Sequence, residues 1–487
     1  MNCKLYIHIL FLALAFSACR HAMVPDTTKA EQPSLFPDYA GVTIPASIAP
    51  LNFNVNEAYS AIHAEIEGAD QSGFSVSGKK FIKWPPKKWS ELLVKNTGDS
   101  IRITVSVKQN GSWIQYAPFA IYISPDPIDY GLAYRLVAPG YEVYSKMGIY
   151  QRDLSTFQQS AIIENTLVPG SCVNCHSFRL TDPNYLNIHM RGPKGGTILK
   201  TGDEINLLNT KTPRTLSNFV YPFWHPSGNF LTYSVNNIKQ VFHETKEKRV
   251  EVVDLASDVI VYDVKNNLTL YCDQLMSDSV FETFPTFSPD GRTLYFCASD
   301  AKEFPSEYQQ VRYNLCSLAF DPETATFGTR IDTVFHASAL GKSVTFPRPS
   351  PDGRYIMFTL TDYGNFSIWH DEADLYLLDV QTGECRALDA VNSNRTESYH
   401  SWSSNSRWFV FSSRRIDGLY THPFIAHLDE NGNPGKPFVL PQENPGHHDA
   451  LLFSYNIPEF INQPVKLDMH QVEYLLHTEG TKVEQRE

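Results

Sequence analysis

The sequence has few features of a membrane-spanning or nucleic-acid-binding protein. Its most apolar run in 487 residues, Leu5 to Phe16, is shorter than the roughly 20 residues needed to span a bilayer. No later segment is apolar enough to span one. The formal net charge is -12 and no long basic run is present. Because phosphate contacts need clustered Lys and Arg, we expect no nucleic-acid partner.

Motifs for catalysis are also scarce. The chain has no G-x-S-x-G nucleophile elbow, and no segment of hydrolase size follows its last repeat. These absences argue against a serine peptidase. No other motif marks an enzyme, so we do not predict one.

The N-terminus has the order of an export signal. Lys4 precedes the apolar run, and the small residues Ser17 and Ala18 precede Cys19. This order resembles the lipobox of bacterial lipoproteins, although Phe16 stands where leucine is usual. The resemblance implies a signal peptide over 1–18, lipidation of Cys19 and a flexible tether over 19–40. It places the protein in the bacterial cell envelope, lipid-anchored at the outer membrane or the periplasmic face. Ordinary cleavage nearby, with Cys19 incidental, is the alternative.

A repeat is present over most of the chain. Its clearest copies are YPFWHPSGNFLTYS from Tyr221, FPTFSPDGRTLYFCAS from Phe284 and FPRPSPDGRYIMFTL from Phe346, with a more degenerate copy from Tyr399. Each copy has an aromatic residue, usually a proline, then a polar turn and an alternating strand. The copies begin 53 to 63 residues apart, which is enough for four antiparallel strands each.

The stretch FPTFSPDG resembles the TolB-type propeller repeat. This resemblance implies an all-β protein with a six-bladed β-propeller over 127–460 and four-stranded blades around a central channel. Alternating segments and hairpin turns over 41–126 predict a small β-sandwich-like domain before it. Residues 461–487 are expected to form a C-terminal tail.

One pentad stands out from the repeat, namely Cys172-Val173-Asn174-Cys175-His176. It matches the signature of c-type haem attachment, in which two thiols add to the vinyl groups and the adjacent histidine ligates iron. The motif therefore implies one covalent haem c on Cys172 and Cys175, with His176 as axial ligand. His189 is the first candidate for the distal ligand, and Met190 and Met147 are alternatives.

Three other interpretations of the pentad stay open. A Cys172–Cys175 disulfide suits an oxidising compartment. A thiol redox centre also uses Cys-x-x-Cys, but the usual βαβ context is absent. A zinc site needs two more ligands, and the chain has no second closely spaced cysteine pair.

Aligned with the repeat, Cys175-His176 falls on His225-Pro226, which predicts that the pentad replaces an inner-strand turn. We therefore expect a cell-envelope lipoprotein whose haem c serves electron transfer or haem-linked sensing with an envelope redox or scaffold protein partner. The alternative is a non-enzymatic TolB-like interaction scaffold in which the cysteine pair is a disulfide.

Overall fold

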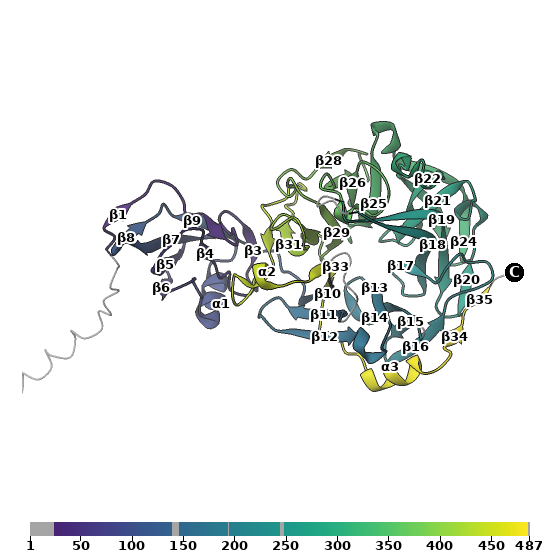
Figure 1. The fold of residues 1–487 in the computed structure, drawn as a ribbon, viewed down its shortest axis with the longest axis horizontal. Coiled ribbons are helices and arrows are strands. Elements are labelled where there is room, and N and C mark those ends of the chain that lie inside the picture. The colour runs from purple at the N-terminus through teal and green to yellow at the C-terminus, as the bar shows by residue number, and fades with distance from the viewer. Residues whose placement is uncertain (1–23, 139–145, 193, 244–247, 486–487) are drawn as a thin grey trace, which may run out of the picture.

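The computed structural model describes residues 24–138, 146–192, 194–243 and 248–485. Strands account for 49% of the protein and helices for 8%, which confirms the predicted all-β class. Figure 1 shows two parts, a small N-terminal unit in purple and blue and a ring of sheets from blue to yellow. Within the described ranges, no helix is both long and apolar enough to cross a membrane. Cys19 and the signal segment lie outside the described residues.

The N-terminal unit is built on one seven-stranded sheet. Strand β7 (Ser100–Gln109) pairs with β5 (Ala61–Gly68) along one edge. Its other edge pairs with β8 (Ser112–Gln115) and β9 (Phe119–Ser124). The smaller strands are β1 (Thr27–Thr28), β3 (Thr43–Pro45) and β6 (Gly73–Gly78) in this sheet, and the separate pair β2 (Leu35–Phe36) and β4 (Asn54–Val55). Every second residue of β5 is buried, as a sheet with one covered face requires.

This unit departs from the predicted β-sandwich. Helix α1 (Pro86–Lys95) buries Trp89, Leu92 and Leu93 in the core of the large sheet, so a helix rather than a second large sheet covers it. The predicted tether is also wrong for residues 27–40. There β1 pairs with β8, and Leu35 and Tyr39 are buried in the same core. A few well-spaced apolar side chains anchor this segment, despite its prolines and polar composition.

Six antiparallel sheets follow the N-terminal unit. Their strands are, sheet by sheet, β10 (Gly131–Val137), β11 (Gly148–Asp153) and β12 (Gln159–Glu164) with β33 (Ser454–Ile461); β13 (Cys172–Arg179), β14 (Asp182–Arg191), β15 (Gly196–Thr201) and β16 (Glu204–Asn209); β17 (Val220–Trp224), β18 (Phe230–Phe242), β19 (Val250–Asp263) and β20 (Leu268–Leu270); β21 (Val280–Phe287), β22 (Thr293–Asp300), β23 (Asn314–Asp321) and β24 (Thr326–Phe335); β25 (Ser343–Pro349), β26 (Tyr355–Thr361), β27 (Asp374–Asp379) and β28 (Cys385–Ala387); and β29 (Glu397–Trp402), β30 (Trp408–Ser413), β31 (His422–His427) and β32 (Phe438–Val439).

The six sheets form a closed ring (Figure 1). Their innermost strands contact one another in the order β13, β17, β21, β25, β29 and β33, and β33 contacts β13 in turn. The first sheet joins the two ends of the ring, because β33 from near the C-terminus pairs antiparallel with β10. This pairing satisfies the backbone groups of an otherwise open strand edge and holds the ring shut.

The N-terminal unit and the ring share one hydrophobic core. Trp84 and Phe119 of the N-terminal unit belong to the same buried cluster as Trp408 and Phe438 of the ring. Polar contacts reinforce this core, since the Asn52 side chain donates to the carbonyl of Glu443 at 2.9 Å. The first unit is therefore packed firmly against the ring.

Residues 461–485 form helix and strand, contrary to the predicted tail over 461–487. Helix α3 (Met469–Leu476) buries Val472 and Leu476, and Asp468 caps its N-terminus. Strand β34 (Thr481–Lys482) then adds to β16, and β35 (Glu484–Gln485) adds to β20. The remaining helical segments are α2 (His447–Ala450) and the 3-10 turns η1 (Asn165–Leu167), η2 (Asp273–Leu275), η3 (Tyr308–Gln310), η4 (Ser338–Leu340) and η5 (Ser367–Trp369).

Every innermost strand of the ring has a β-bulge at a residue with positive φ. These residues are Cys175 (45°), Tyr221 (51°), Phe284 (50°), Phe346 (53°), Tyr399 (49°) and Ile457 (51°). Positive φ is uncommon outside glycine and persists only where surrounding structure stabilises it. Its recurrence at six equivalent places shows that all six sheets are copies of one structural unit.

Candidate functional site

The pentad lies at the bulge of β13, inside the strand and not at its turn. Cys175 is the bulged residue, because Asn174 pairs with His189 and His176 pairs with Ile188. The structural equivalent of Cys175-His176 is therefore Tyr221-Pro222, and the predicted alignment with His225-Pro226 is wrong by four residues. That alignment matched the pentad to the polar turns of the other copies, whereas the equivalent position in each sheet is the bulged residue of the innermost strand.

The bulge brings the two cysteines to one cavity. In a regular strand, side chains three residues apart point to opposite faces. The extra residue at Cys175 changes this alternation, so Cys172 and Cys175 both line a cavity of about 430 Å³. We call it the upper cavity. It lies inside the ring, since strands of four different sheets contribute to its wall.

The wall of the upper cavity is aromatic and cationic. Its aromatic side chains include Tyr221, Phe366, Trp369 and Tyr399. Its charged side chains are Arg135, Arg191 and Arg414, and no carboxylate is among its described lining residues. Sequence reasoning did not identify Arg135 or Arg414, because they lie far from the pentad along the chain.

A constriction separates the upper cavity from a smaller one. Tyr221, Phe284, Phe346 and Tyr399 pack ring against ring, with centroid separations of 4.5, 4.1 and 4.8 Å between successive members. The smaller space, the lower cavity, has a volume of about 20 Å³, room for about one water molecule. Cys175, Tyr221, Tyr399 and Ile457 line both cavities.

His176 lines the lower cavity and not the upper one, contrary to the predicted arrangement. His176 is 3% exposed, and neither ring nitrogen meets the geometry of a hydrogen bond within the described part of the chain, although the backbone of Ala133 and Ile457 lies close by. Burial, aided by the charge of Arg135, lowers the pKa of His176 to about 3, so the imidazole is neutral. A neutral, unpartnered imidazole is chemically suited to ligation, but it lies on the other side of the constriction from the upper cavity.

The three predicted distal ligands do not all line the same cavity. His189 and Met190 line a third cavity of about 390 Å³, and His189 Nδ1 is 3.1 Å from the Thr197 hydroxyl. His176 and His189 therefore do not face each other across one space. Met147 lines the upper cavity together with both cysteines. It is thus the predicted distal candidate that the structure brings to the sulfurs.

The cysteine thiols differ in their surroundings. All six described cysteines are free thiols. Burial raises the pKa of Cys172, and the positive charges of Arg135 and Arg191 oppose that rise. Cys297 and Cys316 are buried in one other sheet, on β22 and β23, whereas Cys272 and Cys385 are half-buried. Within the described ranges, no group of three or more His, Cys, Asp or Glu side chains is placed to hold a metal ion.

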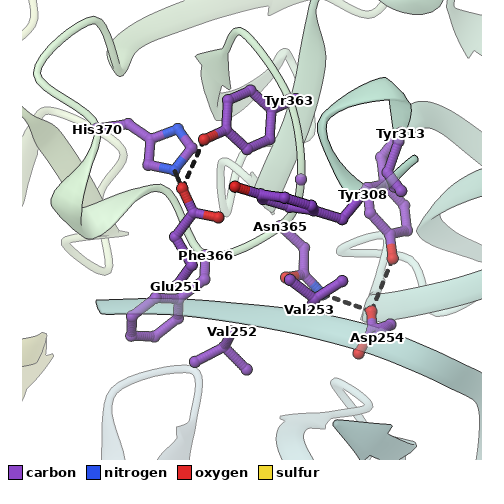
Figure 2. Close-up of a pocket in the computed structure, with 12 residues that line it drawn as sticks. Glu251, Val252, Val253, Asp254, Tyr308, Tyr313, Tyr363, Asn365, Phe366 and His370 are labelled. Carbon is purple, nitrogen blue, oxygen red and sulfur yellow. Dashed lines mark hydrogen bonds and ion pairs between the residues drawn. The ribbon is translucent and has the colours of Figure 1, made fainter. Parts of the chain in front are cut away.

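A buried polar network anchors β19 beside the upper cavity. Figure 2 shows Glu251 accepting a hydrogen bond from the Tyr363 hydroxyl, at 2.5 Å, with His370 Nε2 3.9 Å away. On the same strand, Asp254 accepts from the Tyr313 hydroxyl at 2.7 Å, and burial raises the pKa of Asp254 to about 6. Strand β19 also contributes Val250 and Val252 to the upper cavity, so this network fixes part of its wall.

An apolar cavity of about 350 Å³ adjoins the lower cavity, and Arg348 and Glu459 line both. Its other walls are mostly aromatic and proline side chains from several sheets, including Phe178, Trp224, Phe287, Pro349 and Trp402. Burial raises the pKa of Glu459 to about 7, although Arg348 opposes that rise.

Comparisons with known proteins assign no family. Neither a scan against protein-family models nor a search of curated proteins finds a match. Among solved structures, a puromycin-hydrolyzing peptidase of Mycobacterium tuberculosis is similar at 11% identity and a TM-score of 0.35, over 71% of this chain and 52% of that chain. Prolyl oligopeptidase B from Galerina marginata is similar at 10% identity and a TM-score of 0.34, over 69% and 52%. The chain thus spans about half the length of these two structures.

Proposed function

We propose that the six sheets are the blades of a TolB-like six-bladed β-propeller. Three features support this proposal, namely the circular order of contacts between innermost strands, the closing pair β10 and β33, and the bulge repeated once per sheet. A closed propeller places the constriction on its axis and the upper cavity at one mouth of its channel.

We further propose that Cys172 and Cys175 attach one haem c in the upper cavity. The observation that carries this proposal is that both cysteines line the same space of about 430 Å³. Cofactor pockets commonly range from about 300 to 1,000 Å³ and have largely apolar walls. Each attachment forms a C–S bond as one vinyl π bond breaks, and the thiol hydrogen moves to the other vinyl carbon. No oxidant is needed.

The residues of the pentad and the upper cavity fit haem c in part. The two thiols and the aromatic wall fit covalent attachment and the exclusion of water from a flat ring. His176 does not fit as the structure stands, because it faces the lower cavity. Ligation by His176 requires its side chain to leave that cavity, whereas Met147 already lines the upper one. Haem c, when bound, supplies a one-electron redox centre, which suits electron transfer or haem-linked sensing with an envelope protein partner.

The order of residues 1–19 supports export and a lipid anchor at Cys19. Haem is joined to such motifs outside the bacterial cytoplasm, so an envelope location and the pentad agree. Cys19→Ala is expected to release the protein from the membrane fraction into the soluble envelope fraction. An unchanged membrane fraction for that variant contradicts the lipoprotein proposal.

The attachment proposal is tested on protein made together with haem-maturation machinery. After acid-acetone extraction, the wild type is expected to keep its Soret band, because the thioether bonds survive. Cys172→Ala/Cys175→Ala is expected to lose it, and Cys272→Ala/Cys385→Ala is the matched control that keeps it. A wild type without a retained band removes the haem proposal and leaves the interaction scaffold in its place.

A further inference from the structure

Three arginines line the upper cavity without a carboxylate partner among the described residues. They come from separate sheets, with Arg135 on β10, Arg191 at the end of β14 and Arg414 directly after β30. In the described part of the protein none of them lies within 4 Å of a carboxylate. Arg102, Arg395 and Arg415 elsewhere in the protein each form such a pair. The upper cavity therefore has an excess of positive charge.

Arg414 is held firmly in place. It is 3% exposed, its guanidinium lies 3.2 Å from the centre of the Trp369 ring, and it donates to the carbonyls of Ile368 and Leu419 at 2.6 and 2.5 Å. Burial lowers its pKa to about 9, with Asp371 and Asp417 partly opposing. A buried cation is costly unless an anion compensates it.

Arg135 and Arg191 leave donors available to the cavity. Arg135 is half-buried and donates through Nη1 to the side chain of Asn174, and its other terminal nitrogen has no hydrogen bond to a described residue. Arg191 is exposed. Both arginines lie close to the cysteines, because Arg191 is the cross-strand partner of Cys172 and Arg135 donates to Asn174, between the two cysteines.

We propose that the upper cavity binds a flat apolar ligand bearing two carboxylates, and that Arg135, Arg191 and Arg414 recognise these carboxylates. Guanidinium groups match carboxylates in geometry as well as charge. The flat body packs against Tyr221, Trp369 and Tyr399 of the aromatic wall. This inference extends the haem proposal and rests on it only for the covalent bonds. Recognition of carboxylates by the arginines applies equally to the propionates of haem and to the carboxylates of a free tetrapyrrole.

The test uses reduced full-length protein made without haem-maturation machinery. Binding of protoporphyrin IX, with two free carboxylates, is compared with binding of its dimethyl ester, both delivered from the same detergent micelles and followed by porphyrin absorbance. The wild type is expected to bind the diacid at least about tenfold more tightly than the ester, the effect of one or more charge-assisted hydrogen bonds.

Variants assign this preference to the arginines. Arg135→Gln/Arg191→Gln is expected to reduce the preference to near one, and Arg191→Glu, at an exposed position that tolerates change, is expected to reduce it as well. Arg214→Gln is the matched control, because Arg214 stacks on Tyr271 and pairs with Asp273 away from the cavity. A preference near one in the wild type overturns the inference, and so does a preference that survives Arg135→Gln/Arg191→Gln.

The porphyrin-binding test and the haem-attachment test distinguish the two proposals, because each can give its result independently of the other. A wild type that prefers the diacid but never acquires covalent haem supports carboxylate recognition of a free ligand and removes the haem proposal. A wild type that acquires covalent haem but shows no preference for the diacid retains the haem proposal and removes the role of the arginines.

Discussion

Cys175 and Tyr221 occupy equivalent positions in neighbouring sheets of the ring. Both are the bulged residue of an innermost strand, with φ of 45° and 51°. A cysteine thus stands at a place where four of the six sheets have an aromatic residue. Cys175 lines the upper cavity, and the next residue, His176, occupies the position that Pro222 has after Tyr221.

The constriction is expected to be a major source of stability. Phe284→Ala removes a buried ring that contacts Tyr221 and Phe346, so it should lower the free energy of unfolding by about 3–5 kcal/mol. Urea denaturation measures the change. Leu340→Ala, at a side chain that is 63% exposed, is the control and should change stability by less than about 0.5 kcal/mol. Equal stabilities of the two variants contradict a packed constriction.

The shared cavity of Cys172 and Cys175 is testable without haem. Phenylarsine oxide bridges two neighbouring thiols, so reduced native protein should take up one equivalent. Cys172→Ser or Cys175→Ser should abolish this uptake, and Cys272→Ser should not. Uptake that begins only after unfolding by denaturant shows that the native sulfurs do not face one accessible space.

The free energy of unfolding should decrease as the pH rises, because of Glu282. Burial, reinforced by the charge of Asp258, raises the pKa of Glu282 to about 9. The folded state therefore binds this proton more tightly than the unfolded state does. The stabilisation is present below the ordinary carboxyl pKa and is lost as the pH rises through about 9.

Glu282→Gln keeps this side chain neutral at every pH. It should leave stability at pH 5 little changed and raise it at pH 9 by about 1 kcal/mol or more, measured by urea denaturation. Glu323→Gln, at an exposed carboxylate, should change neither value. Parallel pH profiles for the wild type and Glu282→Gln are incompatible with a buried, protonated Glu282.

The Glu251 network is expected to hold β19 against the neighbouring sheet. Tyr363→Phe removes the hydroxyl that donates to Glu251 and leaves a buried carboxylate with a weaker partner, His370. The cost should be about 1–3 kcal/mol in the free energy of unfolding. Tyr474→Phe, at a tyrosine that is 70% exposed, should have almost no effect. An unchanged free energy of unfolding for Tyr363→Phe is evidence against a role of the Glu251 network in holding β19.

The fold class and the repeats were predictable from local sequence, because each aromatic-proline pair, turn and alternating strand lies within one sheet. The closing strand β33 was not identified, since its Ile457-Pro458 lacks the aromatic residue of the other copies. The ordered segment around Leu35 and Tyr39 was also missed. Its few apolar residues are buried by contacts with distant parts of the chain.

The site was predictable only in part. The pentad identified Cys172 and Cys175, but strand alternation alone places their side chains on opposite faces, and only the bulge brings them together. Matching Cys175-His176 to the aromatic-proline pair Tyr221-Pro222 and to the aromatic-histidine pair Tyr399-His400 was the available signal for that bulge. Arg414 had no such signal, because the ring closes distant segments around one cavity.

The most direct test of the account is mass spectrometry of the tryptic peptide that ends at Arg179, from protein made in cells that attach haem to a control cytochrome. We predict that this peptide carries the mass of one haem, bonded through both Cys172 and Cys175. The same peptide with two unmodified cysteines, alongside a fully loaded control cytochrome, contradicts the account.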